Sequence, residues 1–500
     1  MFNKTLSIIG KNLDHFFRAI YLSGLFLSTA NVIAAVPELP TDFSRAQPME
    51  QFSGGASSSN NRGRNSFLHP ATNLSFDNKL NFKIGESIFA KLWVFSPSST
   101  QASDGLGPLH NARSCMGCHI RGGRGHVPEG NWPIDNAISM LMRLSIEPQN
   151  DLQRALLASG RLAFITEPTY GAQIQDFALQ GMPAEGRINI SYTEQTLALS
   201  DGTLVSMRQP TYSLSDLSYG PLHPDSKFSV RIANPMLGLG LLEAITEQDV
   251  LSLAEAQERS GQGISGRPNR VWEHSSQSIV LGRFGWKAGS PSLNQQNSAA
   301  FATDMGLSTP LFKDAYQGDC TAAQQQCLQA VDGRSAHLAD LEVAPQMSQM
   351  LNLFVRNIAV PKRRNVENLQ VLAGKKIFYD SGCASCHQPS FITGKDTAAE
   401  QAQQLIWPYT DLLLHDMGEA LADHRPEFQA SGSEWRTAPL WGIGATAAVS
   451  GKTEFLHDGR ARSLLEAILW HGGEAASSRD KVINMQRSQR TALMAFLESL

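Results

Sequence analysis

CMGCH at residues 115–119 and CASCH at residues 383–387 are the two stretches that decide the fold. In each stretch, two cysteines stand three positions apart and a histidine follows directly. On one helical turn, the two thiols can add to the two vinyl groups of one haem, and the next residue then places an imidazole beneath the iron. The sequence therefore predicts two covalently bound c-type haems with their irons. Their attachment sites are Cys115, Cys118, Cys383 and Cys386, and their iron ligands are His119 and His387.

Paired cysteines have two other common uses. A zinc site would leave both trailing histidines without a role, and a thioredoxin-like redox site does not need them. Haem is therefore favoured. The remaining cysteines, Cys320 and Cys327, are seven residues apart, which suits a local disulfide in an oxidising compartment.

The N-terminus has the pattern of a secretory signal. Lys4, Lys11 and Arg18 precede an apolar stretch at 19–35 that ends in small residues. Polar residues interrupt this stretch, so a membrane anchor is the weaker alternative, and no later segment approaches a membrane span. We therefore expect a cleaved signal over 1–35 and a periplasmic location. The net charge of −4 gives no general nucleic-acid footprint.

A short pattern recurs before each haem motif: GESIF at 85–89 and GKKIF at 374–378. A glycine with a bulky apolar residue one turn later is how the first helix of a cytochrome c packs closely on another helix. A looser echo follows each motif, GSPSL at 289–293 and GRARSL at 459–464. The chain therefore looks like a mainly α-helical protein with two cytochrome c-like domains.

The two predicted domains are unequal. The first covers 81–360 and the second 361–500, after a linker or surface arm at 36–80 that is rich in Pro, Ser, Asn and Gly. The first is enlarged by an insertion at about 150–270. Within it, 187–213 alternates between apolar and polar residues around Asp201-Gly202, which is typical of a β-hairpin.

The C-terminus has the spacing of an amphipathic helix. Its apolar residues follow at i, i+3, i+4 and i+7, namely Leu493, Phe496, Leu497 and Leu500. In a cytochrome c fold the last helix crosses the Gly/Phe helix. We therefore expect this helix to pack on the GKKIF segment.

The ligand on the far side of each haem iron decides whether the protein is an electron carrier or an enzyme. A strong sixth ligand makes an electron carrier, and an open position makes a site for peroxide or oxygen. Met417 lies thirty residues after His387 and is either the distal ligand of the second haem or a core methionine; His415 is an alternative ligand. His126 follows the first motif closely and is either a labile ligand or pocket base, or a surface-loop histidine.

Several longer stretches resemble one family. The chain is similar to the di-haem oxidoreductases, a family of predicted peroxidases also catalogued as thiol oxidoreductases. The resemblance spans about residue 80 to the C-terminus and favours Met417 as a ligand. Its matching stretches are DGLGP (104–108), NARSC (111–115), RFGWKAG (283–289), DLLLHDMG (411–418), EWRTAPLWG (434–442), LHDGRAR (456–462) and WHGGE (470–474).

A more distant resemblance is to the bacterial di-haem cytochrome c peroxidases and the methylamine-utilisation enzymes. Those proteins have a Trp between the haems, then a Gln and an acid in the peroxide pocket. The resemblance implies Trp286 as the electron bridge, Gln296 as a hydrogen-bonding pocket residue and Asp304 as the proton-transferring acid. The relatives use Glu at a longer interval, so a capping or surface Asp is the alternative for Asp304, and Glu243 is another candidate acid.

Arginines and tryptophans around the second motif suit haem binding. Arg guanidinium groups pair with carboxylates such as haem propionates, although a solvated basic face is the alternative. The candidates are Arg363, Arg364, Arg460 and Arg462. The tryptophans expected to wall the second haem are Trp435, Trp441 and Trp470.

The resemblance also implies a direction for electrons. The C-terminal haem would accept them from a donor protein, such as a small cytochrome or cupredoxin, and pass them to the N-terminal haem, which meets an oxidant such as hydrogen peroxide. The alternative is a non-catalytic di-haem electron-transfer protein with both irons six-coordinate. Thiol oxidation is disfavoured because all six cysteines have other predicted roles.

Overall fold

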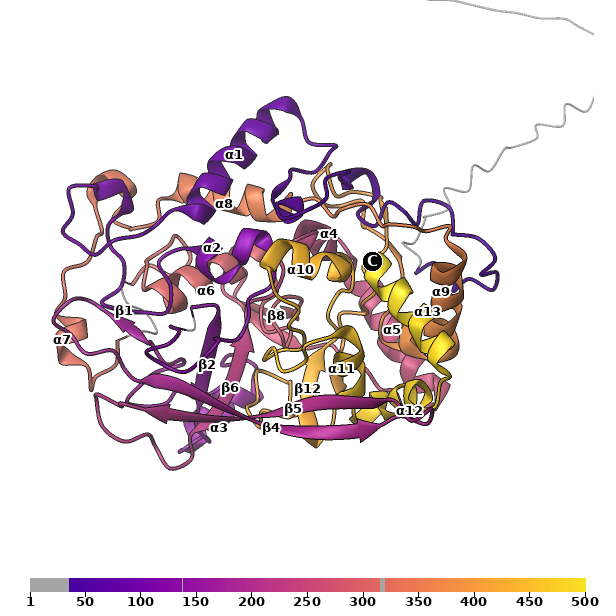
Figure 1. Ribbon diagram of the computed structural model, residues 1–500. Coiled ribbons are helices and arrows are strands. Elements are labelled where there is room, and N and C mark those ends of the chain that lie inside the picture. The colour runs from indigo at the N-terminus through magenta and orange to yellow at the C-terminus, as the bar shows by residue number, and fades with distance from the viewer. Residues whose placement is uncertain (1–35, 137, 315–319) are drawn as a thin grey trace, which may run out of the picture. The chain divides into compact units, whose positions relative to one another are not determined.

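Two pairs of crossed helices organise the fold (Figure 1). The computed structural model describes residues 36–136, 138–314 and 320–500. Helix α1 (Phe76–Ala90) packs on α8 (Pro345–Arg356), and α9 (Leu369–Asp380) packs on α13 (Arg487–Ser499). The second pair confirms the predicted crossing of the C-terminal helix with the GKKIF helix, and the first pair is its counterpart in the first copy.

Glycine allows each pair of helices to cross in contact. A Cβ atom at Gly85 would lie 2.2 Å from the carbonyl oxygen of Met350, and one at Gly374 would lie 1.9 Å from that of Ala492. Both distances are far below van der Waals contact, so any other residue would push the helices apart. The predicted role of the repeated glycine is confirmed at both helix crossings.

The aromatic residue one turn later repeats as well. Phe89 of α1 packs on Phe354 of α8 with ring centres 5.2 Å apart. Phe378 of α9 packs on Phe496 of α13 at the same separation. The two crossings therefore share both their contact residue and their aromatic packing, as a duplication would produce.

Helices outweigh strands, which agrees with a mainly α fold. The described strands form two-stranded antiparallel sheets that pair β1 with β3, β2 with β6, β4 with β5, β7 with β8, β9 with β10, and β11 with β12. The remaining α-helices are α2 (Cys115–Cys118), α3 (Asp151–Ala158), α4 (Leu239–Glu243), α5 (Glu247–Ser260), α6 (Leu293–Met305), α7 (Gln325–Leu328), α10 (Thr446–Ser450), α11 (Leu464–Leu469) and α12 (Ala476–Ile483). The strands are β1 (Leu109–His110), β2 (Met140–Ser145), β3 (Phe177–Ala178), β4 (Arg187–Ala198), β5 (Leu204–Ser215), β6 (Lys227–Ile232), β7 (Arg270–Glu273), β8 (Ser278–Leu281), β9 (Phe391–Ile392), β10 (Leu405–Ile406), β11 (Leu414–Asp416) and β12 (Glu434–Arg436).

The predicted β-hairpin is present and is the longest sheet. Strands β4 and β5 pair from Arg187↔Ser215 to Ala198↔Leu204, and Gly202 in the turn has a φ of 81°. The hairpin packs on the second copy, because Asp201 forms an ion pair with Arg490 of α13 at 2.7 Å. The hairpin thus also braces the C-terminal helix α13 (Figure 1).

The segment at 36–80, assigned above to a linker or surface arm, is packed against residues far along the chain. Glu50 is buried and forms ion pairs with Arg363 and, at 2.7 Å, with Lys375 of α9. A backbone bridge joins Ser59 to Pro361. This segment is therefore anchored on the second copy before α1 begins in the first.

Three further predictions have different outcomes. The disulfide between Cys320 and Cys327 is formed, with Cα atoms 5.6 Å apart. The signal over 1–35 lies outside the described residues, and the domain boundary near residue 360 stays a prediction. Among the helices that the structure describes, none combines the length and the apolar composition that a bilayer crossing requires.

Candidate functional site

The first CxxCH motif forms a short helix that presents its histidine. Ser114 caps α2, with its hydroxyl accepting a hydrogen bond from the Gly117 N–H at 3.1 Å. At the other end, His119 Nδ1 lies 2.7 Å from the carbonyl oxygen of Asn234. A ring whose Nδ1–H donates to a carbonyl has its Nε2 free as a metal ligand, which is the usual arrangement of a ligating histidine.

The second motif repeats this arrangement. His387 Nδ1 lies 2.9 Å from the carbonyl oxygen of Tyr409. The ring centre of His387 lies 6.3 Å from Phe378, and that of His119 lies 6.2 Å from Phe89. Burial lowers the pKa of both histidines, that of His387 to about 4, which favours the neutral imidazole that binds metals.

Each motif opens into its own cavity. Cavity 1 has an empty volume of about 1190 Å³ and contains Cys115, Cys118 and His119 in its wall. Cavity 2 has an empty volume of about 1390 Å³ and contains Cys383, Cys386 and His387. The walls are predominantly apolar, as a haem macrocycle requires.

Corresponding helices line the two cavities. Helix α6 lines cavity 1 and packs on α8, whereas α11 lines cavity 2 and packs on α13. Both begin directly after a serine cap, Ser292 or Ser463, whose hydroxyl accepts from the third backbone N–H beyond it. These caps lie in the two echoes GSPSL and GRARSL, so the looser repeat marks equivalent helices.

The facing surfaces of these helices differ in polarity. The fourth and fifth residues after the cap are Gln296 and Asn297 in cavity 1, but Ala467 and Ile468 in cavity 2. The Gln296 amide makes no hydrogen bond with any described residue. Cavity 1 therefore offers a free polar group where cavity 2 offers apolar atoms.

The cavities meet at two buried arginines. Arg124 and Arg436 line both cavities, and Arg283 lines cavity 1. None of the three forms an ion pair with a described residue, and Arg124 Nε has no hydrogen-bond partner. Burial lowers the pKa of Arg124 and of Arg436 to about 10. An uncompensated buried cation is costly.

The chemistry of these arginines tests whether haem fits. A haem carries two propionate carboxylates, which match guanidinium groups in charge and geometry. The walls therefore supply each of the groups that a bound haem needs: two thiols, a neutral imidazole, apolar faces and unpaired cations. The residues present fit the group.

Trp286, the predicted electron bridge, lies at this junction. Its ring lines cavity 2, while the preceding residue, Gly285, lines cavity 1. The indole Nε1–H donates to the carbonyl oxygen of Ile232 at 2.8 Å, and the Arg436 N–H donates to the Trp286 carbonyl at 2.9 Å. The side chain is thus fixed between the two sites.

Gln296 and Asp304, the other predicted catalytic residues, both line cavity 1 on one face of α6. Asp304 accepts a hydrogen bond from Gln173 at 3.0 Å and acts on the pKa of His119, so it lies near the motif. Glu243 instead pairs with Arg356 at 2.6 Å and is not part of the cavity wall.

The structure distinguishes between the two residues predicted as ligands of the second haem iron, Met417 and His415. Met417 lines cavity 2 beside β11. His415 also lines this cavity, but its Nε2 lies 2.9 Å from Asp411 and its Nδ1 lies 2.7 Å from Glu474. Both ring nitrogens of His415 are therefore occupied by carboxylates.

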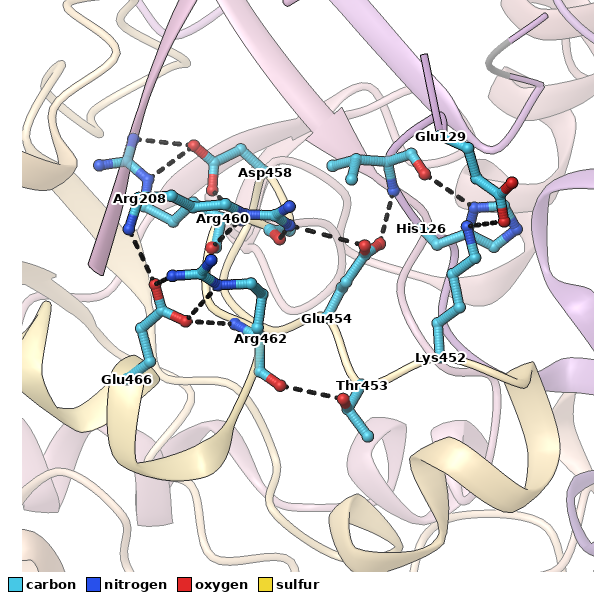
Figure 2. A network of polar contacts seen from close by, with 12 residues as sticks. His126, Glu129, Arg208, Lys452, Thr453, Glu454, Asp458, Arg460, Arg462 and Glu466 are labelled. Atoms are coloured by element: carbon cyan, nitrogen blue, oxygen red, sulfur yellow. Dashed lines mark hydrogen bonds and ion pairs between the residues drawn. The ribbon is translucent and has the colours of Figure 1, made fainter. Parts of the chain in front are cut away.

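The arginines and the histidine proposed from sequence neighbourhood lie elsewhere (Figure 2). Arg460 pairs with Asp458 at 2.8 Å, and Arg462 pairs with Glu466 and with Glu194 of the hairpin. His126 belongs to neither cavity wall. Arg462 contacts the hairpin through Glu194, and Asp458, the partner of Arg460, accepts a hydrogen bond from Tyr212 of the hairpin, so these two arginines join the hairpin to the C-terminal part of the chain.

The other two arginines are occupied as well. Arg363 pairs with Glu50, and Arg364 donates to the carbonyl oxygens of Gly444 and Glu498. Neither lines a cavity. Of the three tryptophans, Trp435 lines cavity 2, Trp441 lines cavity 1, and Trp470 lines neither.

Sequence reasoning missed several cavity residues. Arg283 and Arg436 stand inside the quoted stretches RFGWKAG and EWRTAPLWG, and Arg124 follows the first motif by five residues, so proximity to a motif could have indicated all three. His457 lines cavity 2 and stacks on Trp435 with ring centres 3.7 Å apart. His471 lines the same cavity.

Comparison with known proteins gives one clear match. Among curated proteins, none matches the chain. One similar solved structure is a hydrazine synthase from Kuenenia stuttgartiensis, with 18% identity, a TM-score of 0.21 and a match over 32% of this chain and 57% of that chain, which is too weak to bear on the fold. The family model described as "Di-haem oxidoreductase, putative peroxidase" matches residues 49–500. The chain therefore belongs to the di-haem oxidoreductase family.

Proposed function

We propose that this protein is a periplasmic c-type cytochrome with two covalently bound haems that reduces a peroxide. The observation that carries the proposal is the contrast between its cavities: both present a CxxCH histidine held by a backbone carbonyl, but only the first adds the free amide of Gln296 and the carboxylate of Asp304. A site for electron entry and a site for chemistry are thereby combined in one chain.

Each residue has a distinct task. A haem held by Cys115, Cys118 and His119 would supply the electrons that reduce a peroxide. Gln296 donates a hydrogen bond from its amide to a peroxide oxygen. The Asp304 carboxylate accepts a proton from the incoming peroxide and returns it to the leaving oxygen. Gln173 holds that carboxylate in place through its hydrogen bond at 3.0 Å.

Electrons would pass from the second site to the first. A donor protein, such as a small cytochrome or cupredoxin, would deliver them to a haem held by Cys383, Cys386 and His387, in a cavity that Met417 and His471 also line. Trp286 lies at the junction and would shorten the path to a haem held at His119. Arg124 and Arg436 line both cavities and would pair with haem propionates.

The test uses the full-length protein matured with its haems. A pyridine haemochrome assay should give two haems per chain. Electron paramagnetic resonance and visible spectra, recorded for the oxidised and half-reduced protein, should show one high-spin haem in at least one state, and hydrogen peroxide should perturb it within the mixing time.

Paired variants locate the reaction. The Cys115→Ser/Cys118→Ser variant should retain one haem and lose the peroxide response, whereas the Cys383→Ser/Cys386→Ser variant should lose the response to the electron donor. If both haems of the wild type are low-spin and inert to peroxide in both oxidation states, the protein is a di-haem electron carrier and the proposal fails.

A further inference from the structure

Helices α6 and α11 begin alike where they line their cavities. The first, fourth and fifth residues after the serine cap share one face of each helix. The eighth residue after the cap also lines each cavity, but it lies within α6 in one case and two residues beyond the end of α11 at Leu469 in the other. In cavity 1 the four residues are Leu293, Gln296, Asn297 and Ala300, and in cavity 2 they are Leu464, Ala467, Ile468 and His471. The eighth position is therefore alanine in one copy and histidine in the other.

The partner helices preserve this alignment. Leu351 and Val355 of α8 line cavity 1, while Leu493 and Leu497 of α13 line cavity 2. Each pair directly follows the residue whose carbonyl meets the repeated glycine, so the positions are equivalent. Ala300 and His471 therefore stand at the same distance along the chain from equivalent caps, and each lines the cavity of its own motif.

The ring of His471 is held in the same way as the rings of the two CxxCH histidines. Its Nδ1 lies 2.8 Å from the carbonyl oxygen of Ala467, and no described residue makes a hydrogen bond with its Nε2. His471 and His387 both line cavity 2. A neutral ring with a free Nε2 in a haem cavity has the form of an axial ligand.

The backbone that follows His471 packs closely against the segment that carries Met417. Gly472 and Gly473 lie against Asp416–Gly418, where a Cβ at Gly472 would come within 2.8 Å of the Met417 carbonyl oxygen. The Met417 side chain packs against a hydrophobic cluster that contains Leu421 and Trp435. Met417 thus fills the wall of cavity 2 beside the histidine.

We propose that His471 is the distal ligand of the haem iron at His387, and that Ala300 leaves the corresponding side of the haem at His119 without a protein ligand. The inference rests on the haem-binding part of the proposed function. It assigns bis-histidine ligation to the second haem, which gives a lower reduction potential than the His/Met pair expected from sequence. A single position after equivalent caps then separates the electron-entry site from the reactive site.

Reciprocal variants of the haem-loaded full-length protein test the assignment. In His471→Ala, one of the two haems should change from low-spin to high-spin in the ferric resting spectrum, and added imidazole should restore it. In Ala300→His, the high-spin haem should become low-spin and its response to peroxide should be lost. His126→Ala and Ala299→His serve as controls, because neither position lines a cavity.

The Met417→Leu variant tests whether Met417, rather than His471, is the ligand. The inference requires that this variant keep the wild-type spin states and that the wild type lack the sulfur-to-iron charge-transfer band of a methionine-ligated haem. If the band is present and Met417→Leu abolishes it while His471→Ala leaves both haems unchanged, Met417 is the ligand and the inference is wrong. If His471→Ala does not fold, the Ala300→His and Met417→Leu spectra decide.

These outcomes are distinct from failure of the proposed function. Absence of two covalent haems in the wild type would overturn both. Two haems with His471 as a ligand but no peroxide reaction would leave the ligand assignment standing and overturn only the peroxidase activity.

Discussion

Arg124 lies over the ring of Trp286 where the two cavities meet, with the guanidinium carbon 5.5 Å from the centre of the indole ring. A cation over an aromatic face is attracted to it, and more strongly when both are buried. Because Arg124 lines both cavities and no described residue supplies it with a carboxylate, its charge acts on both cavities.

Neutralising this charge should lower the reduction potential of the haems. Arg124→Gln removes a cation that disfavours ferric iron, and the effect is on the order of 1–2 kcal/mol for charges about 10 Å apart at an effective dielectric constant of about 20. Potentiometric titration followed by visible spectra measures it. Arg121→Gln is the control, since Arg121 donates to the Val449 carbonyl outside both cavities. Equal potentials in both variants would contradict the prediction.

Replacing the bridging tryptophan should slow electron transfer between the haems. Trp286→Phe keeps an aromatic ring but loses the hydrogen bond to Ile232, at a cost of about 1 kcal/mol in stability. Rapid-mixing reduction should then show a slower second phase with unchanged haem spectra. Trp272→Phe, in β7 and outside both cavities, should leave the rate as it is.

The polar face of α6 should control the peroxide reaction. Asp304→Asn removes the proton acceptor and should lower the rate by about 10²–10⁴-fold, the usual contribution of general acid–base catalysis. Gln296→Leu should weaken peroxide binding. Stopped-flow spectra with hydrogen peroxide measure both. Asn294→Ala, on the exposed side of the same helix, is the control, and a wild-type rate in Asp304→Asn would remove that residue from the mechanism.

The crossing of α9 with α13 predicts whether a substitution at Gly374 stabilises or destabilises the protein. By helix propensity alone, Gly374→Ala should stabilise the protein by about 1 kcal/mol. Because the new Cβ would lie 1.9 Å from the Ala492 carbonyl oxygen, we expect instead a destabilisation of about 1–3 kcal/mol. Thermal unfolding distinguishes the two. At the exposed neighbouring position, Ala373→Gly should follow helix propensity and lower the free energy of unfolding by about 1 kcal/mol.

A buried carboxylate should make stability depend on acid pH. Burial tends to raise the pKa of Glu427, but Arg231 and Arg425 outweigh it and lower the pKa from 4.5 to about 2. A depressed carboxyl pKa stabilises the fold above about pH 4.5, and this contribution is lost as the pH falls towards 2. It amounts to on the order of 3 kcal/mol.

Glu427→Gln should therefore lower the free energy of unfolding at neutral pH and flatten its dependence between about pH 4.5 and pH 2. Chemical denaturation across this range measures both effects. Glu255→Gln removes a carboxylate from an exposed pair and should change neither. Parallel curves for wild type and Glu427→Gln would contradict the assignment.

Local patterns in the sequence predicted the fold well where one segment determines its own contacts. The repeated glycine required a close helix crossing, and the alternation around Asp201-Gly202 specified a hairpin. The caps at Ser292 and Ser463 are short-range signals too, and they mark the two cavity helices. These features depend on residues within a few positions of one another.

The cavity residues were harder to predict because distant segments create them. Arg460 and Arg462 stand near a family motif but are neutralised by Asp458, Glu194 and Glu466. Nothing near Arg124 in the sequence shows that it lacks a carboxylate. His471 stands inside the quoted stretch WHGGE, but it follows the second CxxCH motif by more than eighty residues, so only the fold shows that it lines the cavity of that motif.

The ion pairs of Glu50 have a consequence for how the chain folds. Its partners, Arg363 and Lys375, are more than three hundred residues further along, so this early segment cannot reach its final place until most of the chain has been delivered. Contacts of such long sequence separation form slowly. The segment around Glu50 must therefore remain undocked until Arg363 and Lys375 have been made, and its docking is among the last steps by which the chain becomes native.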